Sequence, residues 1–227
     1  MVSKGMANAM LARSQQEPAW WTTNILGNNL WQTQEDIIRS VRDNHETVVA
    51  SCHGAGKSYT AANVALWYLF NHKPSVVITT APTDRQVRGI LWKEIRLAHG
   101  RARIPLGGKL LTQELKLDTN WWAWGFTQPE YDPDRFQGFH EVNILVIVDE
   151  AAGVSEQIYE AIDGVLTSEH SRLLMIGNPT SAAGRFGQSF KKPGISKYTI
   201  SARDTPNFTT LGITEEDVEN GSWEEKI

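Results

Sequence analysis

The segment 51–58 (SCHGAGKS) constrains the fold of this chain more than any other part of it. It follows residues 46–50 (ETVVA), an apolar run typical of a short buried strand, and leads into residues 57–72 (KSYTAANVALWYLFNH), whose apolar side chains recur on one helical face. A glycine-containing turn between a strand and a helix directs free backbone N–H groups and the positive end of the helix dipole towards one point. The segment therefore predicts an anion-binding loop in an α/β fold.

The spacing of this loop matches the phosphate-binding pattern G-x-x-x-x-G-K-[ST], except that Ser51 replaces the first glycine. We expect the replacement to be tolerated, because Gly54 and Gly56 can supply the permissive backbone angles. In this pattern Lys57 reaches the β- and γ-phosphates and the Ser58 hydroxyl binds Mg²⁺. The alternative is a chance Gly-Lys-Ser at an ordinary strand–helix turn. The predicted nucleotide-binding residues of the loop are Ser51, Cys52, His53, Gly54, Ala55, Gly56, Lys57, Ser58 and Tyr59.

A second motif ends the apolar run 143–148 (NILVIV), which is typical of a strand buried on both faces. Asp149 and Glu150 follow it directly. A carboxylate at this position can hold Mg²⁺, and the neighbouring Glu150 can act as the general base that activates a water molecule. Alternatively, the acidic pair could simply begin a helix. The two motifs together favour a P-loop hydrolase that uses ATP and Mg²⁺, with Lys57, Asp149 and Glu150 at its centre.

Further apolar runs at 76–80, 171–176 and 197–200 predict strands, and residues 84–99 predict a helix. Alternating strands and helices indicate an α/β domain. After the run 171–176, Asn178 and Thr180 stand where polar groups can sense the γ-phosphate, although an ordinary Asn-Pro turn explains them equally well.

The predicted helix 84–99 and the loop after it are rich in basic residues, which makes them a candidate nucleic-acid contact. Because the formal net charge is −4, any such contact has to be local. A solvated helix face is the alternative explanation. The basic residues are Arg85, Arg88, Lys93, Arg96, Arg101 and Arg103.

Composition excludes other classes of protein. The single cysteine, Cys52, allows no internal disulfide and indicates a reducing compartment. No stretch of about 18 apolar residues predicts a membrane span, and residues 1–10 do not resemble a signal peptide. Clustered tryptophans at 20–21 and 121–124 are expected to pack rather than to stack on bases, because few basic residues interleave with them.

Six segments occur in one order along most of the chain: SCHGAGKS, TTAPTDRQV, DRFQGFH, ILVIVDEAAGV, MIGNPTS and SARDTPN. Together they resemble the ATPase domain of the large terminase subunit of tailed bacteriophages, the motor that packages DNA into a procapsid. The resemblance implies a three-layer P-loop fold with a mostly parallel central sheet, of the ring-ATPase and helicase kind. We expect an N-terminal extension, helical or irregular, at 1–29, the ATPase domain at 30–207, and an acidic tail or the start of a linker at 208–227.

The resemblance also implies roles and partners. Lys57, Ser58, Asp149 and Glu150 would carry catalysis, and Asn178 and Thr180 would couple hydrolysis to movement. Gln34, with Gln32 in reserve, would contact adenine. The partners would be double-stranded viral DNA, the portal protein, the small terminase subunit and further copies of the chain. These copies would form a ring, pentameric in relatives, in the host cytoplasm, although the isolated domain could be a monomer.

Relatives also carry a C-terminal nuclease domain. We expect the natural chain to continue beyond residue 227, and we predict no nuclease activity for these residues.

One departure from the family concerns the position four residues before Lys57. Many relatives have arginine there, whereas this chain has His53. We therefore expect an arginine from a ring neighbour to meet the transition-state charge. Arg135 is the first candidate, with Arg101 and Arg103 as alternatives; Arg135 could instead pair with Asp132 or Asp134. Two other functions stay open: a helicase-like DNA-dependent ATPase, and a nucleotide-binding assembly module with little turnover.

Overall fold

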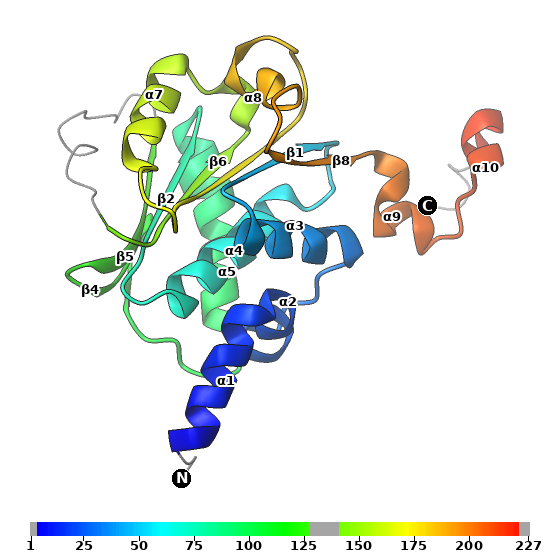
Figure 1. Ribbon diagram of the computed structural model, residues 1–227. Coiled ribbons are helices and arrows are strands. Elements are labelled where there is room, and N and C mark those ends of the chain that lie inside the picture. Colours follow the sequence, from blue (N-terminus) through cyan, green and yellow to red (C-terminus); the bar gives the residue numbers. More distant parts are fainter. Residues whose placement is uncertain (1–3, 128–140, 223–227) are drawn as a thin grey trace.

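The computed structural model describes residues 4–127 and 141–222. An eight-stranded sheet forms its centre, in the order β3-β4-β5-β2-β6-β7-β1-β8 (Figure 1). The six strands from β5 to β8 in that order run parallel, and β4 and β3 extend one edge in antiparallel pairing. The strands are β1 (Glu46–Ser51), β2 (Val76–Ala81), β3 (Lys109–Leu110), β4 (Glu114–Asp118), β5 (Trp121–Thr127), β6 (Ile144–Asp149), β7 (Arg172–Gly177) and β8 (Ser196–Ile200).

Helices cover both faces of the sheet, which confirms the predicted three-layer arrangement (Figure 1). One core cluster joins the sheet to α2, α3, α4 and α5, and the other joins it to α7 and α8. The helical elements are α1 (Lys4–Gln16), α2 (Pro18–Trp21), η1 (Thr22–Leu26), α3 (Gln32–Asp43), α4 (Lys57–Asn71), η2 (Arg85–Leu91), α5 (Trp92–Arg101), η4 (Ala151–Gly153), α7 (Glu156–Val165), α8 (Gly184–Ser189), η5 (Ala202–Asp204), α9 (Pro206–Thr209) and α10 (Glu215–Asn220).

The predicted helix 84–99 differs from expectation at its start, where η2 is π-helical and only α5 is α-helical. The backbone N–H of Trp92 donates to the carbonyl oxygen of Val87, five residues earlier. This wider turn brings Val87 and Trp92 onto one buried face, and both side chains are fully buried. The Trp92 indole N–H then donates to Thr79 Oγ1 at 2.9 Å.

The tryptophan clusters pack, as the sequence predicts. Trp21 is buried in the first core cluster, and Trp121 and Trp122 pack partly buried against the two clusters on opposite faces of the sheet. The sequence did not predict that 121–127 is itself a strand, paired with β4. Residues 19–26 contribute to the core around α4, and the proposed division at residue 30 stays a prediction. None of the described helices is both long and apolar enough to cross a membrane.

Candidate nucleotide-binding site

Three neighbouring parallel strands, β6, β7 and β1, carry the predicted site at their carboxyl ends. Ala50 of β1 pairs with Gly177 of β7, and Asp149 of β6 pairs with Ile176 of the same strand. β7 thus lies between the strand that precedes the phosphate loop and the strand that ends in the carboxylates. Because the carboxyl ends of parallel strands meet at the same edge, the loops after β1, β6 and β7 lie close together and form one candidate site.

The phosphate loop turns as its glycines allow. Gly54 and Gly56 have φ values of +77° and +80°, a region that side chains other than glycine rarely adopt. Gly56 caps α4, so Lys57 and Ser58 begin the helix where unpaired N–H groups and the dipole favour an anion. Lys57 Nζ donates to the Cys52 carbonyl oxygen at 3.1 Å, which holds the cation over the loop.

A hydrogen bond joins the two motifs across 91 positions of sequence. Ser58 Oγ donates to Asp149 Oδ2 at 2.9 Å. Asp149 is 2% exposed, and burial raises the pKa of its carboxyl to about 6 although the Ser58 hydrogen bond lowers it. Keeping a buried carboxyl group ionised costs free energy unless a cation or hydrogen-bond donors compensate its charge. The pair therefore has the character of a site built for a positive charge.

These two oxygens suit Mg²⁺, which prefers oxygen ligands and often takes only one or two from the protein. Within the described residues no group of three or more histidine, cysteine or carboxylate side chains could hold a metal by itself. A hydroxyl and a carboxylate 2.9 Å apart therefore fit a metal whose remaining ligands are phosphate oxygens and water.

Glu150 is held in an unusual backbone conformation beside the loop. Its φ of +48° is the only positive value among the described non-glycine residues. Such an angle costs free energy and persists only where the surroundings enforce it. Gly177 at the end of β7 backs directly onto this turn, because a Cβ there would lie 2.9 Å from the backbone N of Ala151. The Glu150 carboxylate lies 3.9 Å from Lys57 Nζ and is partly exposed.

The predicted sensor residues separate in space. Asn178 Nδ2 donates to His53 Nε2 at 3.1 Å, so the residue after β7 contacts the phosphate loop. Thr180 is exposed and donates its backbone N–H to the Asn178 carbonyl oxygen. The structure therefore brings Asn178 to the loop and connects Thr180 to the site only through the turn.

A cavity of about 290 Å³ opens beside the loop. Its lining combines predicted residues with two that sequence reasoning missed, Ile90 of η2 and Glu94 of α5. The described lining is Gly54, Gly56, Lys57, Ser58, Tyr59, Ile90, Glu94 and Glu150. No motif marks Ile90 or Glu94, because only tertiary packing brings η2 and α5 against α4. Gln34 is 4% exposed and Gln32 is exposed on the surface of α3, and neither lines this cavity.

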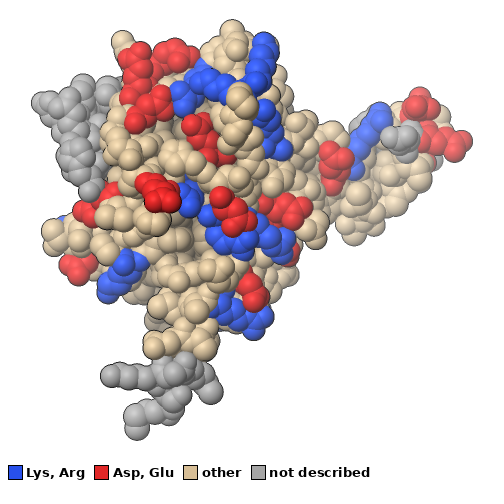
Figure 2. Space-filling view, viewed as in Figure 1, with Lys and Arg blue, Asp and Glu red and all other residues tan. Residues whose placement is uncertain are grey.

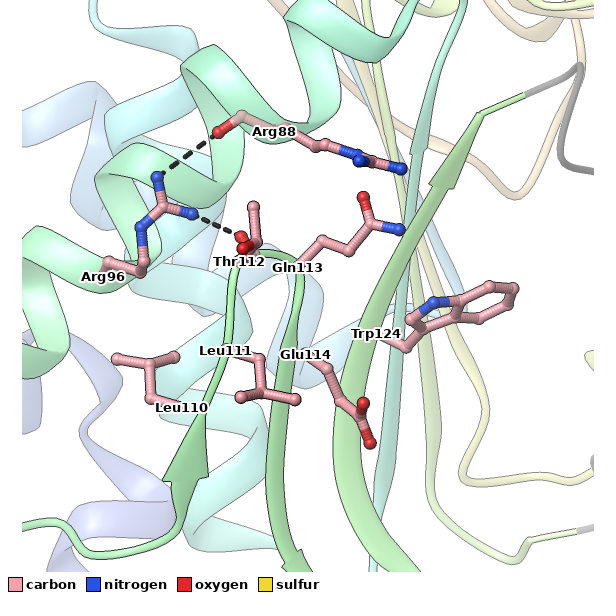
Figure 3. Close-up of a pocket in the computed structure, with 8 residues that line it drawn as sticks. All are labelled: Arg88, Arg96, Leu110, Leu111, Thr112, Gln113, Glu114 and Trp124. Carbon is pink, nitrogen blue, oxygen red and sulfur yellow. Dashed lines mark hydrogen bonds between the residues drawn. The ribbon is translucent and has the colours of Figure 1, made fainter.

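A larger cavity of about 880 Å³ lies between α5 and the turn that joins β3 to β4 (Figure 3). Arg88 and Arg96 from the basic segment line it, together with Trp124. Arg96 donates to the Thr112 carbonyl oxygen and, at 3.5 Å, to that of Arg88. Arg88 Nε lies 2.6 Å from Asp84 Oδ1. Structural contacts thus occupy these two predicted DNA-binding residues.

The other basic candidates, Arg85, Lys93, Arg101 and Arg103, are exposed. On the face shown in Figure 2, basic and acidic side chains lie interspersed. Arg135 and the rest of DRFQGFH lie outside the described residues, as do Asp132 and Asp134.

Comparison with known proteins shows which proteins this chain is similar to. The sequence matches no protein-family model. It is 30% identical over 173 residues to the probable terminase large subunit of Enterobacteria phage P7, covering 73% of this chain and 35% of that protein. This chain is related to phage large terminase subunits. It spans about a third of the length of that relative.

The solved structures agree in fold. The large terminase ATPase domain of Thermus phage P74-26 superposes with a TM-score of 0.66 at 20% identity, over 89% of this chain and 93% of that one. The UvsW helicase of bacteriophage T4 gives 0.53 at 14% identity, over 77% and 61%. The predicted resemblance to the terminase ATPase domain is confirmed. The helicase shows that this fold extends beyond terminases.

Proposed function

We propose that this chain is the ATP-hydrolysing domain of a terminase-type motor that moves double-stranded viral DNA into a procapsid. The observation that carries the proposal is the Ser58–Asp149 hydrogen bond of 2.9 Å, which brings a hydroxyl of the predicted phosphate loop and a buried carboxylate together. The relationship to large terminases then selects packaging among the tasks that such a site can drive.

In this proposal Ser58 and Asp149 would hold Mg²⁺, which would supply positive charge beside the phosphates. Lys57 holds the β- and γ-phosphates, which replace its present partners, the Cys52 carbonyl oxygen and Glu150. Glu150, once released from Lys57, accepts a proton from the attacking water. Glu150 follows the last residue of β6 and lines the cavity, where this proton transfer would take place.

Among the described residues that line the cavity, Lys57 alone is basic. A further cation is therefore needed to stabilise the charge of the transition state. We propose that a ring neighbour supplies an arginine, with Arg135, Arg101 and Arg103 as candidates. Asn178 and Thr180 are proposed to pass the state of the site to the DNA-moving surface. The relationship to terminases is the only basis for the remaining parts of the proposal. These are two partners, the portal protein and the small terminase subunit, and one compartment, the cytoplasm of the host cell.

Steady-state ATP hydrolysis tests the proposal, measured with Mg²⁺ over a wide range of protein concentration, with and without duplex DNA. We expect a rate per subunit that rises with concentration and falls at least about 10²-fold in Glu150→Gln. Glu160→Gln, the same change at an exposed position of α7, is the matched control and should leave the rate unchanged.

Two other outcomes would replace the proposal. A concentration-independent rate that Glu150→Gln abolishes would indicate a self-sufficient, helicase-like site. Tight ATP binding without hydrolysis in wild type, even with DNA and at high concentration, would indicate a nucleotide-binding assembly module.

A further inference from the structure

The turn that carries Glu150 is held by contacts at both of its ends. The Glu150 N–H donates to Asp149 Oδ1 at 3.0 Å, and the Gly153 N–H donates to the Glu150 carbonyl oxygen at 3.0 Å. A Cβ on Gly153 would lie 2.8 Å from Pro82 Cγ, so the loop after β2 packs closely against the end of the turn. The backbone around Glu150 therefore has little room to move.

One further contact to this turn comes from a side chain of helix α7. Tyr159 is 2% exposed, and its hydroxyl donates to the Ala151 carbonyl oxygen at 2.7 Å in a buried hydrogen bond. The same oxygen also accepts the Val154 N–H, at the longer distance of 3.4 Å. The Tyr159 hydroxyl is thus the closer of two donors that hold the residue next to Glu150.

Helix α7 is itself anchored, so Tyr159 can serve as a fixed point. The guanidinium group of Arg185 in α8 donates to both carboxylate oxygens of Asp163 in α7, at 2.8 and 3.0 Å. The Arg185 backbone N–H donates to Glu156 Oε1 at 2.9 Å, and Phe186 of α8 is buried in the same core cluster as Tyr159. The two helices therefore form one packed unit behind the Glu150 turn.

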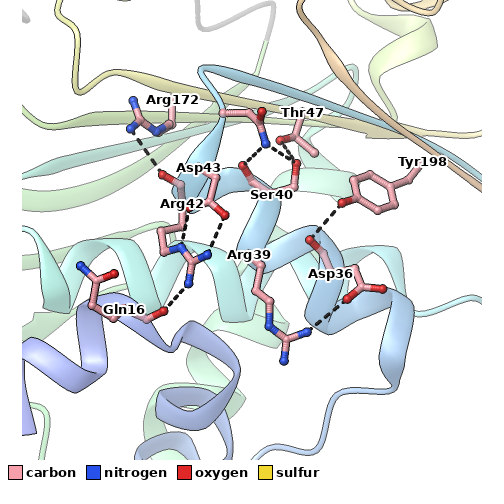
Figure 4. Close-up of polar contacts among 10 residues, drawn as sticks. Gln16, Asp36, Arg39, Ser40, Arg42, Asp43, Thr47, Arg172 and Tyr198 are labelled. Atoms are coloured by element: carbon pink, nitrogen blue, oxygen red, sulfur yellow. Dashed lines mark hydrogen bonds and ion pairs between the residues drawn. The ribbon is translucent and has the colours of Figure 1, made fainter.

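Tyr68 and Tyr198 make the same kind of hydrogen bond elsewhere in the fold. Tyr68, near the carboxyl end of α4, is also 2% exposed and donates to the His170 carbonyl oxygen at 2.8 Å. Tyr198 of β8 donates to the Asp36 carbonyl oxygen at 3.2 Å and joins its strand to α3 (Figure 4). The Tyr159 bond differs from both, because its acceptor is the residue that follows the proposed general base.

We infer that Tyr159 is a positioning residue, which acts through the Ala151 carbonyl oxygen to fix the Glu150 carboxylate beside the cavity. The positive φ of Glu150 costs free energy and persists only where the surroundings enforce it. Without the Tyr159 hydroxyl the turn loses one of these restraints, and the base leaves hydrogen-bond reach of the water. The contacts that Lys57 and Ser58 make with phosphates are unaffected. The inference rests on the proposed function, in which Glu150 is the general base.

Steady-state ATP hydrolysis with Mg²⁺ tests the inference. Tyr159→Phe removes only the hydroxyl and keeps the ring in the core. We expect kcat to fall about 10- to 100-fold, because a small displacement of a catalytic group costs a rate factor of this size. KM should stay unchanged, since ground-state binding is not altered.

Tyr68→Phe is the matched control, because it removes a hydroxyl of equal burial from a hydrogen bond of nearly equal length. It should lower the midpoint of urea denaturation by a similar amount and leave kcat unchanged. Equal losses of kcat in the two variants would show that lower stability explains the effect. An unchanged kcat in Tyr159→Phe, or a higher KM alone, would also overturn the inference.

The double variant Glu150→Gln with Tyr159→Phe separates a positioning role from a general one. When the base is already absent, losing the hydroxyl that positions it should cause no further loss of rate. A further loss, as large as that of Tyr159→Phe alone, would show that Tyr159 acts on another part of the site.

Hydrogen exchange in nucleotide-free protein gives a reading that does not depend on hydrolysis. The amides of Gly153 and Val154 should exchange faster in Tyr159→Phe than in wild type or Tyr68→Phe, and unchanged exchange would contradict the inference. If wild type does not hydrolyse ATP, the proposed function fails while this measurement still decides whether Tyr159 holds the turn. If Tyr159→Phe does not fold, Arg185→Met, which releases α7 from α8, takes its place in both measurements with the same expected and contradicting results.

Discussion

The two cavities of this domain differ in a way that volume does not reveal. The cavity beside the phosphate loop, about 290 Å³, is bordered by a buried cation, Lys57, and by the Ser58 hydroxyl, which is bonded to the buried carboxylate of Asp149. The cavity beside the β3–β4 turn is about three times larger, at about 880 Å³, yet its guanidinium groups contact backbone carbonyl oxygens or Asp84. Buried charged side chains therefore single out the smaller cavity as the candidate site, whereas size would single out the larger one.

Replacing one cation in each cavity tests this contrast most strongly. Lys57→Met should lower kcat/KM for ATP by about 10²- to 10³-fold, because it removes a donor from developing phosphate charge. Arg96→Met should leave kcat/KM unchanged and lower the free energy of unfolding by about 1 kcal/mol, because it loses hydrogen bonds to two carbonyl oxygens. Steady-state kinetics and urea denaturation measure both. A larger loss of activity in Arg96→Met than in Lys57→Met would reverse the assignment.

The buried charge of Asp149 gives the next largest effect. Its pKa is raised to about 6 in the folded protein from 3.8, so the native state binds the proton more tightly and gains stability as pH falls through 6 towards 4. At pH 7.5 the ionised carboxylate therefore costs the nucleotide-free protein about 1–3 kcal/mol. Asp149→Asn should raise the free energy of unfolding at pH 7.5, should lose that advantage near pH 4.5, and should abolish Mg²⁺-dependent nucleotide binding.

Urea denaturation at both pH values, without nucleotide or metal, checks the sign. An equal effect at pH 7.5 and pH 4.5 would show that packing, and not the charge, is responsible.

Two glycine-to-alanine substitutions, one beside Glu150 and one away from the site, test the role of the backbone. Gly177→Ala places a Cβ 2.9 Å from Ala151 N, so the Glu150 turn has to shift. We expect a loss of about 1–3 kcal/mol in stability and a lower kcat. Gly164→Ala meets nothing within 4 Å on helix α7 and should stabilise by about 0.5–1 kcal/mol without changing kcat. Thermal denaturation and steady-state kinetics of the two variants measure both effects. A normal kcat in Gly177→Ala would show that the packing of β7 against the Glu150 turn does not affect catalysis.

The smallest expected effect concerns the His53–Asn178 hydrogen bond, worth about 1 kcal/mol. His53→Leu and Asn178→Ala should each lower kcat about fivefold, and the double variant should be no worse than either. His53→Gln keeps an acceptor and should retain most of the rate. His170→Leu, at an exposed histidine, is the control. Strictly additive losses would show that the two side chains act separately.

The sequence predicted the local elements of the site well, because their signals are local. The predicted strand before Ser51 and the helix from Lys57 are present as β1 and α4, and the apolar run before Asp149 is β6. Each rests on periodicity or on a turn that a few neighbouring residues dictate. The antiparallel edge was missed, since tryptophans at 121–124 indicated packing without indicating a pairing partner.

By itself, the sequence determined that a glycine loop joins a buried strand to a helix and that a second buried strand ends in two carboxylates. Tertiary structure alone decided that β7 separates these strands, that Gly177 backs onto Glu150, and that Gln34 contacts the backbone of the phosphate loop. The physical reason is distance along the chain. Backbone angles and apolar periodicity act between near neighbours, whereas contacts such as Ser58–Asp149 exist only after the core has fixed the order of the strands.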